Sequence, residues 1–159
     1  MSRLLIAHLS TIQSLTLSAI AAPLSLTPGP AHFEQLARQG NVVPLYAELI
    51  ADSETPVSAF QKIDDGGDCF LFESAETNEE SGRFSFIGFD PQLVFESRDR
   101  TITVASGGQT HSFQTETDPL HELEAVMQRF RFVALPQLAH FSAGAVGFIG
   151  YEVVRFFEP

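Results

Sequence analysis

The sequence predicts an α+β fold, built on a mostly antiparallel sheet with flanking helices. Two segments, near residues 55–63 and 118–130, carry apolar residues at helical spacing, whereas the stretch from 70 to 114 alternates apolar and polar residues as extended strands do. Turn residues such as Asp90-Pro91 and Gly107-Gly108 separate the extended runs at hairpin-like intervals. A length of 159 residues favours one domain with a substantial core.

Residues 1–27 are predicted to be an N-terminal extension, separate from a domain that spans residues 28–159. Arg3 and the apolar stretch up to Ala-Ile-Ala-Ala-Pro are similar to a secretory signal, but His8, Gln13 and several hydroxyl residues interrupt that stretch. We therefore expect a disordered extension or a misassigned start, with release of a secreted domain after Ala21 or Ala22 as the alternative. No run approaches the roughly 18 apolar residues of a membrane span.

Two helices and an intervening strand are expected in the first part of the domain. The first helix is predicted to begin at Thr27-Pro28-Gly29-Pro30 and to end at Gly40. Its inward residues are expected to be Phe33, Leu36 and Ala37. A strand is predicted at 42–49. The second helix is predicted to begin at Thr55-Pro56, because a hydroxyl can cap it and proline fits its first turn.

Extended segments follow as an antiparallel meander. Residues 70–72 are predicted to form a buried strand that presents Glu73 and Ser74 at its end. Further strands are expected at 84–87, 93–95, 101–104 and 111–114, the last two joined by a turn at Gly107-Gly108.

A helix and a glycine-rich apolar run are expected at the end of the chain. Asp118 is predicted to cap a helix whose inward stripe comprises Leu120, Leu123, Met127 and Phe130. Residues 145–149 are predicted to form a buried strand. A helical segment over 151–157 is then expected to place Val154 and Phe157 on one face, beside Phe156.

Four sequence blocks together resemble the N-terminal portion of anthranilate synthase component I. They are PLYAELIADSETPVSAFQKI, FLFESAE, GRFSFIG and GAVGFIGYEVVRFFEP, and the similarity extends from about Phe33 to Pro159. The resemblance implies an incomplete part of a larger two-sheet fold, in which the chorismate and magnesium residues belong to a C-terminal domain. We therefore expect no catalytic residue here and no metal site.

The resemblance also implies an activity for the complete protein. The family's enzyme converts chorismate and glutamine-derived ammonia to anthranilate and pyruvate in tryptophan biosynthesis. It needs Mg²⁺ and works with a glutamine amidotransferase subunit in the cytoplasm. Two alternatives stay open: the corresponding part of aminodeoxychorismate synthase component I in folate synthesis, and an independent amino-acid-binding module.

Glu73 and Ser74 are the predicted ligand-binding pair. A carboxylate can pair with a ligand's ammonium group, a hydroxyl can bind its carboxylate, and phenylalanines can enclose an aromatic side chain. In the family, the equivalent Leu-Leu-Glu-Ser motif helps to form the site where tryptophan binds as feedback inhibitor. The resemblance thus implies that Glu73, Ser74 and the nearby Arg83 contribute to an allosteric tryptophan site, with Phe72 replacing a leucine. The alternative from the residues alone is a solvent-exposed strand end.

Charge and motifs argue against several other functions. The net charge is −11, and ten carboxylates face Lys62 alone between Asn41 and Glu80, so nucleic acid is not an expected partner. The five histidines are dispersed, which gives no metal-binding spacing. Cys69 is the single cysteine and stands in an apolar context, so we expect a buried, inert thiol without a disulfide.

Overall fold

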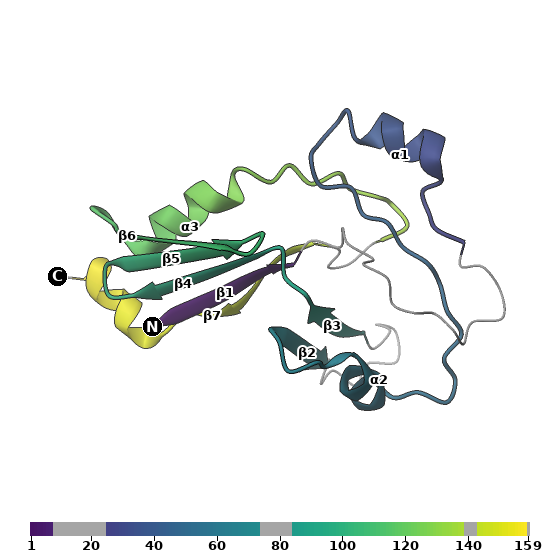
Figure 1. Ribbon diagram of the computed structural model, residues 1–159, viewed down its shortest axis with the longest axis horizontal. Coiled ribbons are helices and arrows are strands. Elements are labelled where there is room, and N and C mark those ends of the chain that lie inside the picture. The colour runs from purple at the N-terminus through teal and green to yellow at the C-terminus, as the bar shows by residue number, and fades with distance from the viewer. Residues whose placement is uncertain (8–24, 74–83, 139–142, 159) are drawn as a thin grey trace.

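The computed structural model contains a five-stranded sheet, a two-stranded sheet, three α-helices and one 3₁₀ helix in its described residues (Figure 1). These residues are 1–7, 25–73, 84–138 and 143–158. All strand neighbours in both sheets are antiparallel. The predicted α+β class is therefore confirmed. No helix in these ranges has the length and hydrophobicity needed to cross a membrane.

The five-stranded sheet has the order β6-β5-β4-β1-β7. Its strands are β1 (Ser2–Ala7), β4 (Leu93–Arg98), β5 (Thr101–Ser106), β6 (Gln109–Gln114) and β7 (Gly144–Phe148). The predicted meander is confirmed in β4, β5 and β6, whereas the strands expected at 70–72 and 84–87 form a separate sheet. Gly107 and Gly108 join the last two strands with φ angles of +58° and +74°, which is the backbone conformation that the tight hairpin turn requires.

Strand β1 corrects the expectation for the first residues. It pairs with β4 on one side and β7 on the other, so that Leu5 is opposite both Val94 and Val146. For residues 2–7 the prediction of an unstructured extension was wrong, because two distant strands supply backbone partners that no local sequence signal reveals. Residues 8–24, including Ala21, lie outside the described residues, and the rest of that prediction stays untested.

The main core lies between the sheet and α3 (Pro119–Met127), which covers one face of it (Figure 1). Phe95 and Ile102 are 1% and 0% exposed, and Leu93 is also buried. Leu123, Val126, Met127 and Phe130 pack against them. The helix begins as predicted, since the Asp118 carboxylate accepts hydrogen bonds from the backbone N–H groups of residues 120 and 121, both at 2.9 Å.

A second core forms around α1 (Pro30–Leu36), which begins after the cap residue Gly29. Leu36 packs with Val133 and Leu135, but Phe33 and Ala37 are exposed, so two of the three predicted inward residues were wrong. The strand predicted at 42–49 is absent. Only isolated bridges form there, from Val42 to Phe132 and from Tyr46 to Thr27, because Pro44 between them lacks the N–H that a continuous ladder needs.

The helix α2 (Pro56–Ile63) packs on a small sheet of β2 (Cys69–Glu73) and β3 (Ser85–Phe89). The predicted start of α2 is confirmed: the Thr55 hydroxyl accepts from the Ser58 N–H, and the Ser58 hydroxyl accepts from the Thr55 N–H. A Cβ on Gly88 would lie 2.1 Å from the ring of Phe70, so glycine leaves the space that this ring occupies.

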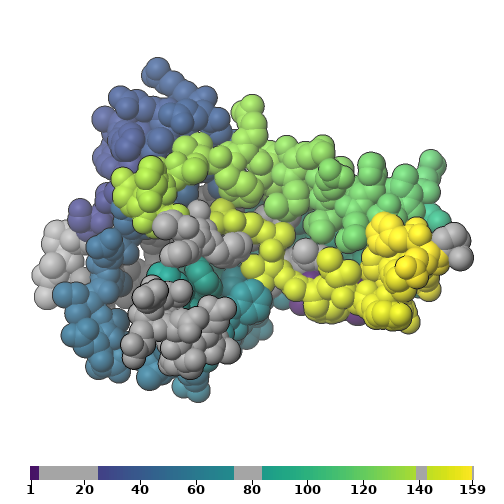
Figure 2. Space-filling view, turned by 180° about the vertical axis from the view of Figure 1, so that it is seen from behind, coloured from purple at the N-terminus to yellow at the C-terminus, as the bar shows by residue number. Residues whose placement is uncertain are grey.

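The C-terminal run forms β7 and the 3₁₀ helix η1 (Tyr151–Phe156), and it lies on the molecular surface (Figure 2, yellow). Val146 and Val153 are buried, whereas Phe148, Ile149 and Phe157 are each 54% exposed. The predicted inward face with Phe157 was therefore wrong. A 3₁₀ helix has three residues per turn, which changes the residues that face the sheet.

Candidate functional site

Glu73 is the last residue of β2, lies opposite Ser85 of β3 and is exposed to solvent. Its predicted position at the end of a strand is confirmed. Ser74 and Arg83 lie outside the described residues, so the structure does not bring the three predicted site residues together or separate them. The tryptophan-binding role of Glu73, Ser74 and Arg83 stays a prediction.

The two faces of the β2–β3 hairpin differ in chemistry. Side chains alternate along each strand, and residues opposite each other share a face. Glu73 therefore lies on the face of Leu71 and Ile87, whereas the rings of Phe70 and Phe72, 5.0 Å apart, lie on the other face. Phe89 of β3 also lies on the face of Glu73, but it is opposite Cys69 at the other end of the ladder, so an aromatic enclosure around a ligand of Glu73 would need further side chains.

Cys69 opens the same hairpin strand and is half-buried, so the prediction of a buried thiol was wrong in that respect, but its surroundings disfavour the thiolate. Burial raises the pKa of the Cys69 thiol, and the negative charge of Asp64 raises it further. The sulfur lies 3.6 Å from the Asp64 carboxylate, to which it donates. A thiol that resists ionisation is a poor nucleophile, so the residue gives no support to covalent catalysis.

A hollow of about 380 Å³ lies where η1 meets the turn between β4 and β5. Arg100 and Arg155 place their guanidinium carbons 5.5 and 5.6 Å from the ring centre of Phe156. Arg155 pairs with Asp99, and the Arg100 Nη1 donates to the backbone carbonyls of residues 115–117. The Arg155–Asp99 pair and the contacts with Phe156 hold η1 on the turn between β4 and β5, and the Arg100 hydrogen bonds hold that turn to the chain after β6, so both arginines have structural partners.

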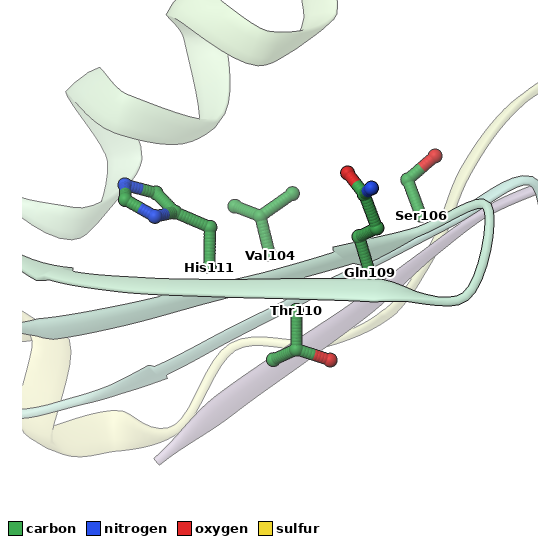
Figure 3. A pocket seen from close by; sticks show the side chains of 5 residues that line it. All are labelled: Val104, Ser106, Gln109, Thr110 and His111. Carbon is green, nitrogen blue, oxygen red and sulfur yellow. The ribbon is translucent and has the colours of Figure 1, made fainter.

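A second hollow, of about 520 Å³, lies on the hairpin of β5 and β6. Val104, Ser106, Gln109 and His111 project from one face of this hairpin, and Thr110 projects from the other (Figure 3). The lining offers hydroxyl, amide and imidazole groups for hydrogen bonds but no carboxylate or guanidinium. Neither hollow includes Glu73.

Metal ligands do not gather in the part of the chain that the structure describes. No group of three or more His, Cys, Asp or Glu residues there could hold an ion. The magnesium implied by the family resemblance therefore has no ligand set among these residues.

The sheet, the small hairpin and the flanking helices define an α+β protein, and comparison with known sequences identifies its relatives. Anthranilate synthase component 1 of Synechocystis sp. is 45% identical over 136 residues, that of Acetivibrio thermocellus 37% over 124, and that of Saccharomyces cerevisiae 35% over 151. The chain is a homologue of anthranilate synthase component 1, and the resemblance seen in its sequence is confirmed.

These alignments cover 84%, 77% and 88% of this chain but only 26%, 25% and 27% of the respective relatives. The chain thus spans about a quarter of the length of the curated relatives that it matches. No protein-family model matches the sequence, and no solved structure matches it significantly.

Proposed function

We propose that the chain is the N-terminal regulatory and scaffolding part of an anthranilate synthase component 1 that acts in the cytoplasm. The observation that carries this proposal is the identity of 33–45% to relatives of that name, over about four fifths of the chain. The complete protein would form anthranilate from chorismate, with ammonia delivered by a glutamine amidotransferase subunit. Its Mg²⁺ ligands would belong to the chorismate-binding C-terminal domain.

The exposed apolar residues at β7 and η1 support the scaffolding part of the proposal. Phe148 and Ile149 are half exposed, and Tyr151 is 88% exposed. Among the described strands β7 pairs only with β1, so no described strand covers its outer edge. Apolar side chains beside such an edge are typical of a surface that other polypeptide covers, and we assign that role to the remaining three quarters of the protein.

The regulatory part of the proposal concerns tryptophan. Glu73 would pair with the ammonium group of tryptophan, while Ser74 and Arg83 would bind its carboxylate. A ligand shifts an equilibrium only when it binds one state better than the other. Tryptophan would therefore have to favour an inactive arrangement of this hairpin relative to the catalytic domain.

A chimera tests both parts. The matched region of the Synechocystis protein is replaced by this chain, and anthranilate fluorescence is followed with chorismate, Mg²⁺ and ammonium. The chimera is expected to form anthranilate and to be inhibited by tryptophan. In a Glu73→Gln chimera, the tryptophan concentration that halves the rate should rise roughly tenfold or more, as expected for a lost charged hydrogen bond.

Glu34→Gln is the matched control, because Glu34 is an exposed carboxylate on α1 and far along the chain from the hairpin. Its half-inhibition concentration should stay that of the parent chimera. A folded chimera that forms no anthranilate would contradict the family function. Equal tryptophan sensitivity of the parent and Glu73→Gln chimeras would contradict the regulatory site while leaving the scaffolding role in place.

A further inference from the structure

Arg3 of β1 connects the five-stranded sheet with the chain that leads into β2. Its Nη2 lies 2.8 and 2.9 Å from the two carboxylate oxygens of Asp68, the residue immediately before β2. Its Nε lies 2.6 Å from Oε1 of Glu96 on β4, the residue opposite Arg3 in the sheet. The Nε is buried and makes no hydrogen bond, so its contact with Glu96 is an ion pair.

The two parts that Arg3 connects are otherwise loosely joined. Helix α2 packs on β2 and β3, and this unit lies beside the five-stranded sheet rather than within it (Figure 1). Among the described residues, Arg3 with Asp68 is the one ion pair between the unit and the sheet. Without this ion pair, the chain connections and apolar contacts would have to hold the unit in position.

Burial and charge both make this contact stronger than an ordinary surface pair. The side chains of Arg3, Asp68 and Glu96 are 37%, 27% and 37% exposed, so water and salt screen them only in part. The Arg3 guanidinium pairs with the carboxylates of both Asp68 and Glu96. Without it, Asp68 and Glu96 would face each other as like charges, in a chain that is already strongly acidic.

We propose that Arg3 is a positioning residue that holds the α2–β2–β3 unit against the large sheet and so fixes where Glu73 is presented. Asp68 immediately precedes the strand that ends at Glu73, so an anchor at one end of β2 sets the direction of the other. The role of Glu73 as a tryptophan ligand rests on the proposed function, whereas the anchoring of the hairpin does not.

Amide hydrogen exchange on the 159-residue chain tests the anchor without any ligand. In Arg3→Met, exchange in β2 and β3 is expected to become about three- to tenfold faster, while exchange in β4 and β5 keeps its parent rate. Asp68→Asn should give the same pattern of exchange. Because it changes no residue of the large sheet, it still tests the anchor if Arg3→Met fails to fold. Arg38→Met removes an exposed arginine that follows α1 and should change neither region.

Raising NaCl from about 0.05 M to about 1 M should speed exchange of the hairpin in the parent chain but not in Arg3→Met, because salt screens an ion pair that the variant lacks. Unchanged hairpin exchange in both variants would overturn the proposal. So would an equal increase in the hairpin and the large sheet, since that result means a loss of overall stability alone.

The tryptophan-inhibited chimera gives the second measurement. Arg3→Met should raise the half-inhibition concentration of tryptophan severalfold, while Arg38→Met leaves it unchanged. If the hairpin loosens but inhibition of the chimera is the same with and without Arg3, Arg3 does not position the site and the inference fails. If hairpin exchange responds as expected but the parent chimera is not inhibited at all, the anchor is supported and the proposed tryptophan site is what fails.

Discussion

Deleting residues 2–7 is expected to abolish the cooperative unfolding transition of the chain. These residues form β1, which pairs with β4 and β7 over most of its length. Its removal would leave two rows of backbone groups without partners in the middle of the sheet. Ser2, which is 2% exposed and accepts a hydrogen bond from the Gly150 N–H at 3.1 Å, would be lost with it.

Leu5→Pro should reproduce the effect of the deletion with one substitution. Proline removes a backbone donor from a strand that is paired on both sides, and such positions do not tolerate it. Thermal melting followed by circular dichroism is the measurement, with Leu5→Val as the control that keeps the donor and a strand-forming side chain. A Leu5→Pro chain that melts with the parent's midpoint would contradict the placement of β1.

The same measurement bears on the alternative that the sequence left open at the N-terminus. Cleavage after Ala21 or Ala22 would remove β1 together with the residues that follow it. A folded, cooperative chain that begins at residue 23 would therefore contradict the sheet order as well as support that alternative. The expected result is a chain that aggregates or melts without a transition.

Elements with local signals were predictable from the sequence. A capping side chain followed by proline marks the starts of α2 and α3, and two adjacent glycines mark the turn between β5 and β6. These signals act within a few residues, so the sequence contains all of the information they need. The alternation of apolar residues in β4 belongs to the same category.

Elements that depend on distant partners were not predictable in this way. Strand β1 is stabilised by strands that lie roughly 90 and 140 residues further along the chain, and nothing within its own six residues separates it from a signal-like segment. The segment 42–49 has strand-forming residues but finds only isolated bridges. In both cases the presence or absence of partner strands in the folded chain, and not the composition of the segment, decides whether a strand forms.

The candidate site shows the same division. The position of Glu73 at a strand end follows from the apolar run before it, and the structure confirms that position. The anchoring role of Arg3 could not be predicted from the sequence, because its partner Asp68 is 65 residues away. A single arginine near the start of a chain does not indicate which carboxylate it will pair with. An acidic residue directly before an apolar strand is the one local feature that could have indicated a cationic partner.

Phe95→Ala is expected to lower the free energy of unfolding by about 3–5 kcal/mol. Phe95 is 1% exposed and forms the centre of the main core with Leu93 and Ile102, beneath α3. Truncation to alanine loses the transfer free energy of the ring and leaves a cavity that the sheet on one side and the helix on the other are too rigid to fill. A loss of this size is a large fraction of the stability of a typical domain.

Urea unfolding at 25 °C, followed by far-ultraviolet circular dichroism, measures this loss directly. Phe148→Ala is the matched control, because it removes the same ring from a position that is 54% exposed, and it should change the free energy of unfolding by less than about 1 kcal/mol. If both variants lost the same free energy of unfolding, the result would contradict the placement of Phe95 in the core. A large loss at Phe148 alone would instead place the stabilising contacts of this chain on β7, at a side chain that the described residues leave half exposed.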